Sequence, residues 1–222
     1  MLPQVPSLGE PIVGSVLEVR DRERVGLKRS FKRIRMLLSL PRLLPHLAFL
    51  LAGPRRDVIK IDLISWAVGM GSKKPQSSWE FIVWFIECMT FLPEFRNLFY
   101  IRVGQISWPF MWLCPRMKDL DLDVGSIGPG LYIQHGQSTF VSAESIGANC
   151  TIGRHVVIGY SNRTDRPTIG NNVHIYAGAK IIGKINLGDN SVVGLNSVVI
   201  TNVEPNVTVF GVPAKAISRS AG

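Results

Sequence analysis

His135 is the side chain of this sequence with the clearest capacity for chemistry. It lies in the segment 134–137, where a regular six-residue spacing of apolar residues gains one residue. A histidine with an ordinary pKa of about 6.5 can take a proton from a hydroxyl group at cellular pH. Irregular places in a regular fold tend to hold functional residues. We expect His135 to act as a general base; the alternative is an exposed corner residue without a catalytic role.

A carboxylate usually accompanies such a base, because it binds the second ring nitrogen and stabilises the protonated ring. Three candidates, Asp119, Asp121 and Asp123, precede His135 by 12 to 16 residues. Spacing alone leaves the choice among them open.

Two further histidines, His155 and His174, follow at intervals of about one coil, which suggests a three-histidine zinc site. Their phases disagree: His135 lies two residues after an apolar anchor, His155 three after one, and His174 one before. The three side chains should point in different directions. We therefore expect no metal site and interpret His155 and His174 as surface corners.

The element that must hold these residues is a repeat array. A large apolar residue returns every sixth position, and glycine directly follows six of these ten anchors. The anchors are Phe140, Ile146, Ile152, Ile158, Ile169, Ile175, Ile181, Leu187, Val193 and Val199. A period of six suits short strands joined by turns and stacked as the rungs of a solenoid. Each anchor should point inward, contributing roughly 1.5–3 kcal/mol when buried, and each glycine should relieve a crowded corner.

The array has one large break. Ile158 and Ile169 are eleven residues apart, and the surplus is the polar stretch 160–167. We expect this stretch to loop out of the coil.

Composition places the chain among ordinary globular proteins, with 222 residues, 46% hydrophobic and 18% charged. The three cysteines, Cys88, Cys114 and Cys150, form neither a disulfide framework nor a zinc pattern. The first residues lack the basic start and apolar core of a secretory signal. A cytoplasmic location is expected.

The net charge of +9 is concentrated in residues 20–35, directly before the apolar stretch 36–52. Pro41 and Pro45 interrupt that stretch, so we do not expect it to span a membrane, which takes about 20 largely apolar residues. Two interpretations stay open: peripheral contact with the inner face of an anionic membrane, or a solvated basic face followed by a core helix. Nucleic-acid binding is not expected, because no recognition motif accompanies the charge.

The whole pattern predicts a mainly β protein with an N-terminal α-helical region. We divide it into a basic and apolar segment (1–56), a helical region (57–118), a β-helix catalytic domain (119–205) and a C-terminal tail (206–222). The helical region holds all five tryptophans, which must pack against the region itself, the coil, another chain or lipid.

Three segments resemble the hexapeptide-repeat acyltransferases, in particular serine acetyltransferases and their relatives that acetylate exopolysaccharide and capsule sugars. They are Pro93-Glu94-Phe95-Arg96-Asn97-Leu98-Phe99-Tyr100, Ile127-Gly128-Pro129-Gly130-Leu131-Tyr132-Ile133-Gln134-His135-Gly136 and Gly211-Val212-Pro213-Ala214-Lys215. The resemblance implies a left-handed parallel β-helix that assembles as a homotrimer, with acetyl-CoA as acetyl donor between adjacent subunits.

The resemblance also assigns roles. His135 matches the catalytic histidine of the family, and Asp121 matches its acid if one residue is deleted between them. The pantetheine arm and phosphates of acetyl-CoA are then expected at positions of the later coils. These positions are Gly159, Ala177, Gly178, Lys180 and Lys215.

The acceptor is where this chain departs from serine acetyltransferases. Gln134 stands where that group has an acid, and the loop reads Thr164-Asp165-Arg166-Pro167 where that group has Asp-Arg-His-Pro. A neutral amide suits hydroxyl groups, so Gln134, Asp165 and Arg166 are expected to bind a sugar of an exopolysaccharide or capsule precursor. Two alternatives are kept: serine as the acceptor, and a trimeric scaffold without catalysis.

Overall fold

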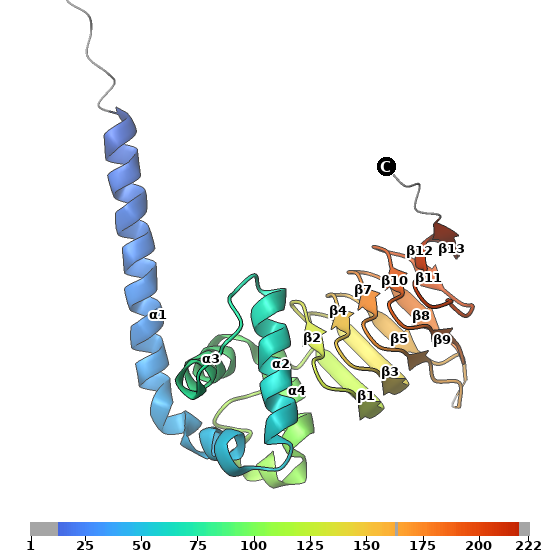
Figure 1. The fold of residues 1–222 in the computed structure, drawn as a ribbon, viewed down its shortest axis with the longest axis horizontal. Coiled ribbons are helices and arrows are strands. Elements are labelled where there is room, and N and C mark those ends of the chain that lie inside the picture. Colours follow the sequence, from blue (N-terminus) through green and yellow to red (C-terminus); the bar gives the residue numbers. More distant parts are fainter. Residues whose placement is uncertain (1–12, 163, 218–222) are drawn as a thin grey trace, which may run out of the picture. The chain divides into compact units, whose positions relative to one another are not determined.

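The computed structural model describes residues 13–162 and 164–217, with side chains described from residue 30 onward. By its contacts the chain divides between Leu40 and Pro41. The first unit holds the N-terminal part of helix α1 (Val13–Ala52). The second holds the end of that helix, the helices that follow it and a coil of short strands (Figure 1).

Helix α1 runs unbroken through Pro41 and Pro45, contrary to the expected interruption. Its stretch Ser30–Ala52 is long and apolar enough to cross a membrane by length and composition alone. Core helices of soluble proteins and signal sequences meet the same measure, so the finding goes no further. The side chains of the basic residues between Arg20 and Arg29 lie outside the described ones, and membrane contact by this segment stays a prediction.

Four short elements form the helical region. They are α2 (Arg56–Gly69), α3 (Ser78–Phe91), α4 (Pro93–Val103) and the 3₁₀ helix η1 (Gln105–Phe110). Ser77 and Glu80 form a reciprocal capping box that starts α3, and Pro93 occupies the first turn of α4, where its missing N–H costs no hydrogen bond.

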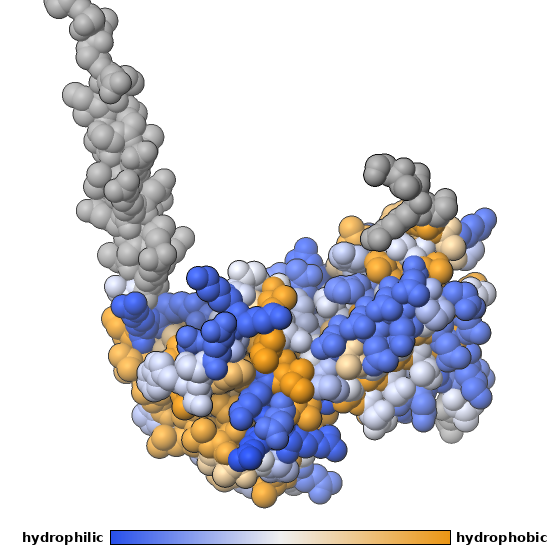
Figure 2. All heavy atoms as spheres, viewed as in Figure 1, coloured by the Kyte–Doolittle hydropathy of each residue, from blue (hydrophilic) through white to orange (hydrophobic). Residues whose placement is uncertain are grey.

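The aromatic residues of this region separate into a core and a surface set. Trp66 packs edge-on against Phe95, with their ring centroids 5.2 Å apart, and both residues are about 1% exposed. Trp79, Trp108 and Trp112 are 69%, 80% and 75% exposed. On the face drawn in Figure 2, apolar surface gathers over the helices, while the outside of the coil is largely polar.

The strands stack in parallel as the rungs of a coil. One sheet joins β2 (Tyr132–Ile133), β4 (Thr151–Ile152), β7 (His174–Ile175), β10 (Val192–Val193), β12 (Thr208–Gly211) and β13 (Ala214–Ile217). The other joins β1 (Leu120–Ile127), β3 (Thr139–Ile146), β5 (Val157–Gly159), β6 (Thr168–Ile169), β8 (Lys180–Ile182), β9 (Asn186–Leu187) and β11 (Val198–Val199). Strand β3 bends, pairing β5 with its first half and β6 with its second, so three stacks of strands enclose the core.

The end of the coil differs from the rungs before it. β12 pairs β10 in parallel and so continues the coil, whereas β13 turns back antiparallel to β12. Both strands lie within the range predicted as a C-terminal tail.

Nine of the ten predicted anchors are buried in the core, and one prediction is wrong. Phe140 is half-buried on the outer side, and its neighbour Val141, fully buried, takes the inward place opposite Ile158. The corner before β3 contains several residues with positive φ, so the strand enters the core one position later than the spacing indicated.

The glycines after the anchors allow adjacent coils to approach each other closely. A side chain at Gly147 would lie 2.7 Å from the backbone nitrogen of Asn171 in the next coil, and one at Gly153 equally close to that of Ala177. Several corners have an asparagine with positive φ, and Asn172, Asn190 and Asn206 form a side-chain ladder along one corner. Each coil is therefore held to the next by both backbone and corner contacts.

A buried ion pair joins the helical region to the first coil. The guanidinium of Arg102 binds the carboxylate of Asp62 at 2.8 Å, and both side chains are 2% exposed. Arg102 also donates to the backbone oxygens of Ile127 and Gly128, while Asp62 accepts from the backbone N–H of Gly130. Burial raises the pKa of Asp62, and the ion pair opposes that rise. The chain leading to His135 is thus anchored by one pair of charges.

We predict that Asp62→Ala lowers the free energy of unfolding by about 3–5 kcal/mol, because it leaves the Arg102 guanidinium buried without a counter-charge. Urea denaturation measures the change. Asp57→Ala, which removes an exposed carboxylate from the same helix, should cost less than about 1 kcal/mol. Equal stability of the two variants would contradict the role given to the pair.

Candidate active site

His135 lies at a corner of the first coil. Its imidazole is exposed and its backbone is left-handed, with φ 67°, followed by Gly136 with φ 49°. The N–H of Gln137 donates to the carbonyl of His135 at 2.6 Å, which tightens the turn. Gly136 is buried against Glu94, Met117 and Leu120. The corner is therefore seated on α4 and on the linker before β1.

The three candidate acids line the outer side of β1 and its approach. Asp119 accepts a hydrogen bond from the backbone N–H of Ser138, at the same corner as His135. Asp121 is exposed, lies beside Phe140 in the parallel pairing, and makes no hydrogen bond to His135 among the described contacts. Its role as the orienting acid stays a prediction.

Asp123 holds the loop that interrupts the array. Its carboxylate accepts from the Arg166 guanidinium at 2.8 Å and from the Ser142 hydroxyl at 3.3 Å. Asp165 turns into the loop, where it accepts from Ser161 and Asn162. Of the three predicted acceptor-binding residues, Arg166 and Asp165 thus have partners inside the chain.

Gln134, the third, lies directly before the base. Its side chain is exposed, and its backbone N–H donates to the carbonyl of Ile152 at 2.8 Å. The amide is therefore presented at the surface next to His135, while the backbone is tied to the coil.

Four of the five predicted acetyl-CoA residues lie along one side of the coil. The backbone of His155 is hydrogen-bonded to Gln137, and that of Gly178 to Arg154, so the corner of His135 continues upward to Ala177 and Gly178. The Lys180 ammonium, in the following strand, donates to the carbonyl of Gly178 at 3.1 Å. Lys215 lies on β13, opposite Phe210 in the antiparallel pair that ends the coil, and its role at the phosphates stays a prediction.

Gly159 differs from the other anchor glycines. A side chain there would meet only Ile182 at 3.8 Å and Phe140 at 3.9 Å, which are ordinary contact distances. Both neighbours are half-exposed. Gly159 is itself buried at the end of β5, next to the strand that follows the His135 corner, and an alanine methyl group would fit there without meeting the backbone.

The other histidines occupy different positions on the coil. His155 occupies a left-handed corner with φ 58°, and His174 is exposed on β7. Across residues 30–162 and 164–217, no three His, Cys, Asp or Glu side chains gather where they could hold a metal ion.

Glu94 is the residue of this site that sequence reasoning missed. It is only 7% exposed and contacts the Gly136 corner. Burial raises the pKa of its carboxyl, and its charge interacts with those of His135 and Arg96. A signal was present, since Glu94 belongs to the segment 93–100 that resembles the family.

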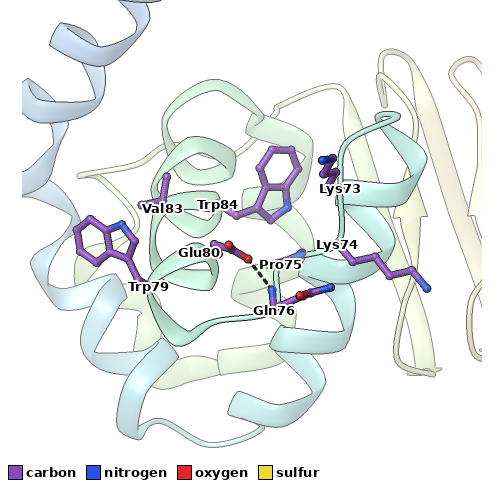
Figure 3. Close-up of a pocket in the computed structure, with 8 residues that line it drawn as sticks. All are labelled: Lys73, Lys74, Pro75, Gln76, Trp79, Glu80, Val83 and Trp84. Carbon is purple, nitrogen blue, oxygen red and sulfur yellow. Dashed lines mark hydrogen bonds between the residues drawn. The ribbon is translucent and has the colours of Figure 1, made fainter.

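A pocket of about 740 Å³ lies elsewhere, between the loop after α2 and helix α3 (Figure 3). Lys73 and Lys74 flank it on one side, and Trp79 and Trp84 on the other. None of the predicted site residues lines it. A second pocket, of about 530 Å³, includes Asp121 and lies beside the His135 corner through Met117 and Leu120.

Comparison with known proteins points to one family, although no family model matches the chain. A stretch of 98 residues is 37% identical to the serine acetyltransferase of Synechococcus elongatus and covers 42% of this chain and 40% of that protein. The enzyme of Staphylococcus epidermidis is 37% identical over 130 residues, covering 56% and 59%. This chain spans about half the length of the curated relatives it matches.

Solved structures agree on the fold. The serine acetyltransferase of Neisseria gonorrhoeae aligns with a TM-score of 0.59 at 24% identity, covering 75% of this chain and 67% of that one. The soybean serine acetyltransferase complexed with serine aligns with 0.58 at 25%, covering 73% and 69%.

Over the matched segments the chain is similar to serine acetyltransferases of the hexapeptide-repeat type. Its coil is a left-handed parallel β-helix, as the family resemblance implied.

We predict that Gly159→Ala raises the KM for acetyl-CoA several-fold without destabilising the fold, because the added methyl group meets no backbone and fills space between Ile182 and Phe140, beside which the pantetheine arm is expected. Gly147→Ala is the matched control: its methyl group collides with the next coil, so it should lower the melting temperature. Initial rates at varied acetyl-CoA and thermal denaturation check both. An unchanged KM in folded Gly159→Ala would place the donor elsewhere.

Proposed function

We propose that this protein transfers the acetyl group of acetyl-CoA to a hydroxyl oxygen. The observation that carries the proposal is the exposed His135 at a left-handed corner of a coil homologous to the serine acetyltransferases. The predicted donor residues Ala177, Gly178 and Lys180 support it, since they lie on the coils that follow the His135 corner.

The chemistry follows from the base. His135 removes the proton of the acceptor hydroxyl as its oxygen attacks the thioester carbonyl carbon. The tetrahedral intermediate then collapses, the carbon–sulfur bond breaks, and the proton passes from the imidazolium to the departing CoA thiolate. The products are an acetate ester and CoA, and His135 returns to its neutral form.

Serine is the acceptor that we propose first. The sequence analysis placed sugar acceptors ahead of it, from Gln134 and Arg166. The named relatives favour serine instead, and the structures aligned with this chain include a serine acetyltransferase complexed with serine.

A sugar hydroxyl stays as the second candidate, on one specific observation. Arg166 stands where serine acetyltransferases have a histidine, and here its guanidinium is paired with Asp123. The exposed Gln134 amide can donate to and accept from hydroxyl groups. Both features suit an uncharged polyol better than an amino acid.

Assembly as a homotrimer, with acetyl-CoA bound between adjacent coils, belongs to the same proposal. It is supported by the family resemblance and by the exposed faces of the coil near His135 and Lys180. Lys180 would approach the phosphates as a point charge.

We predict that His135→Ala lowers the rate of CoA release by about 10²–10⁴-fold, the usual contribution of a general base. His174→Ala is the control, because His174 is also an exposed histidine of the coil, on β7, and should leave the rate unchanged. The release of CoA can be followed with a thiol reagent, because the protein's own cysteines are buried and burial raises the pKa of the Cys150 thiol to about 11. Wild-type protein without turnover on any acceptor would favour the scaffold alternative.

We predict that purified protein releases CoA from acetyl-CoA faster with serine than with capsule-type sugars. The measurement compares initial rates at equal acceptor concentrations, with mass spectrometry of the acetylated product. Turnover of a sugar with none of serine would reverse the order of the two acceptors while leaving acetyl transfer intact.

A further inference from the structure

The corner that carries His135 rests on a buried carboxylate. Glu94, in the first turn of α4, is 7% exposed. A side chain at Gly136 would lie 3.1 Å from the Cβ of Glu94, so the helix and the corner are in direct contact. The residue next to the proposed base is thus seated on an acidic side chain from the helical region.

The Glu94 carboxylate lacks a partner of the kind that buried charges normally have. Among the described contacts it accepts a hydrogen bond from its own backbone N–H, and it forms no ion pair. Buried charges are usually paired or neutralised, because leaving water is costly without compensation. The carboxylate therefore has capacity for a positive charge that arises during the reaction.

The groups around Glu94 identify where that charge can arise. On its own helix its charge interacts with that of Arg96, whose guanidinium donates to the carbonyls of Met89, Thr90 and Pro115. On the coil its charge interacts with His135, which precedes Gly136, and with the Tyr132 hydroxyl. Arg96 is occupied with backbone oxygens, which leaves the imidazole of His135 as the group whose charge changes.

We propose that Glu94 is a positioning residue for the base: its carboxylate stabilises the imidazolium that His135 becomes when it takes the acceptor proton. The inference rests on the proposed acetyl transfer. It gives the helical region a direct part in the reaction, alongside the role predicted for Asp121 on the coil.

This role has a signature in stability. A group whose folded pKa is raised contributes stability that is present below its unfolded pKa and lost as the pH rises through the folded value. Burial raises the pKa of Glu94, so its ionised form disfavours the fold at neutral pH. Glu94→Gln should therefore unfold at an equal or higher urea concentration than wild type at pH 7.5, with the difference vanishing near pH 4.

The kinetic test uses the same variant. Glu94→Gln should lower kcat about 10- to 100-fold, the range seen when a group that orients a functional histidine is removed, with the KM for acetyl-CoA unchanged. The pH dependence of kcat should differ from that of wild type, because an ionisable carboxyl group close to the base has been removed. Glu94→Asp, which keeps the charge, should recover part of the rate. Glu144→Gln, an exposed carboxylate on β3, is the control and should change neither quantity.

Two outcomes overturn the proposal. Wild-type kcat and pH dependence in folded Glu94→Gln would show that the charge is not used, and a variant that is less stable than wild type would make Glu94 a packing residue. Absence of turnover in wild type concerns the proposed function instead. In that case the NMR signals of the His135 ring, compared between wild type and Glu94→Gln across pH, still test the contact: identical titrations refute it.

Discussion

The contact between Asp62 and Arg102 is the constraint on which the rest of this structure depends. The first rung of a β-helix has no rung below it, so its backbone groups need other partners. Arg102 and Asp62 supply them at Ile127, Gly128 and Gly130, and the Trp66 indole adds a bond to the carbonyl of Leu131. The helical region thereby closes the base of the coil and fixes the strand that leads to His135.

Beyond the Asp62–Arg102 contact, the coils stack regularly, so the corners and loops that depart from this regularity are informative. Anchors and close-contact glycines hold each coil to the next with little freedom, so a corner of unusual length persists only if its surroundings support it. The His135 corner has such support, because Glu94, Met117 and Leu120 pack against Gly136. The loop 160–167 has it too, through the pair of Arg166 with Asp123. Gly159, by contrast, is buried without crowding, so close stacking of the coils does not require a glycine at this position.

The likeness to serine acetyltransferases and the differences from them lie in different parts of the molecule. The coil and its motifs follow the family, while Gln134 and Arg166 replace groups expected beside a serine acceptor. Glu94 adds a negative charge near His135 from a helix rather than from the coil. Relative to the family pattern, the chain lacks a carboxylate at position 134, next to the base, but has the Glu94 carboxylate on α4. The region around the imidazole therefore stays acidic, with a different distribution of charge.

The sequence by itself determined the coil, because a six-residue period with glycine after the anchor admits few other folds, and it singled out His135 and the extruded loop. It could not find Phe140 facing outward, since three left-handed residues in the preceding corner shift the strand by one position. It also could not pair Asp62 with Arg102, or bring Glu94 to Gly136, because these partners are 40 and 42 residues apart and no local period relates them. Such contacts depend on how helices pack against the first rung, which only the tertiary structure decides.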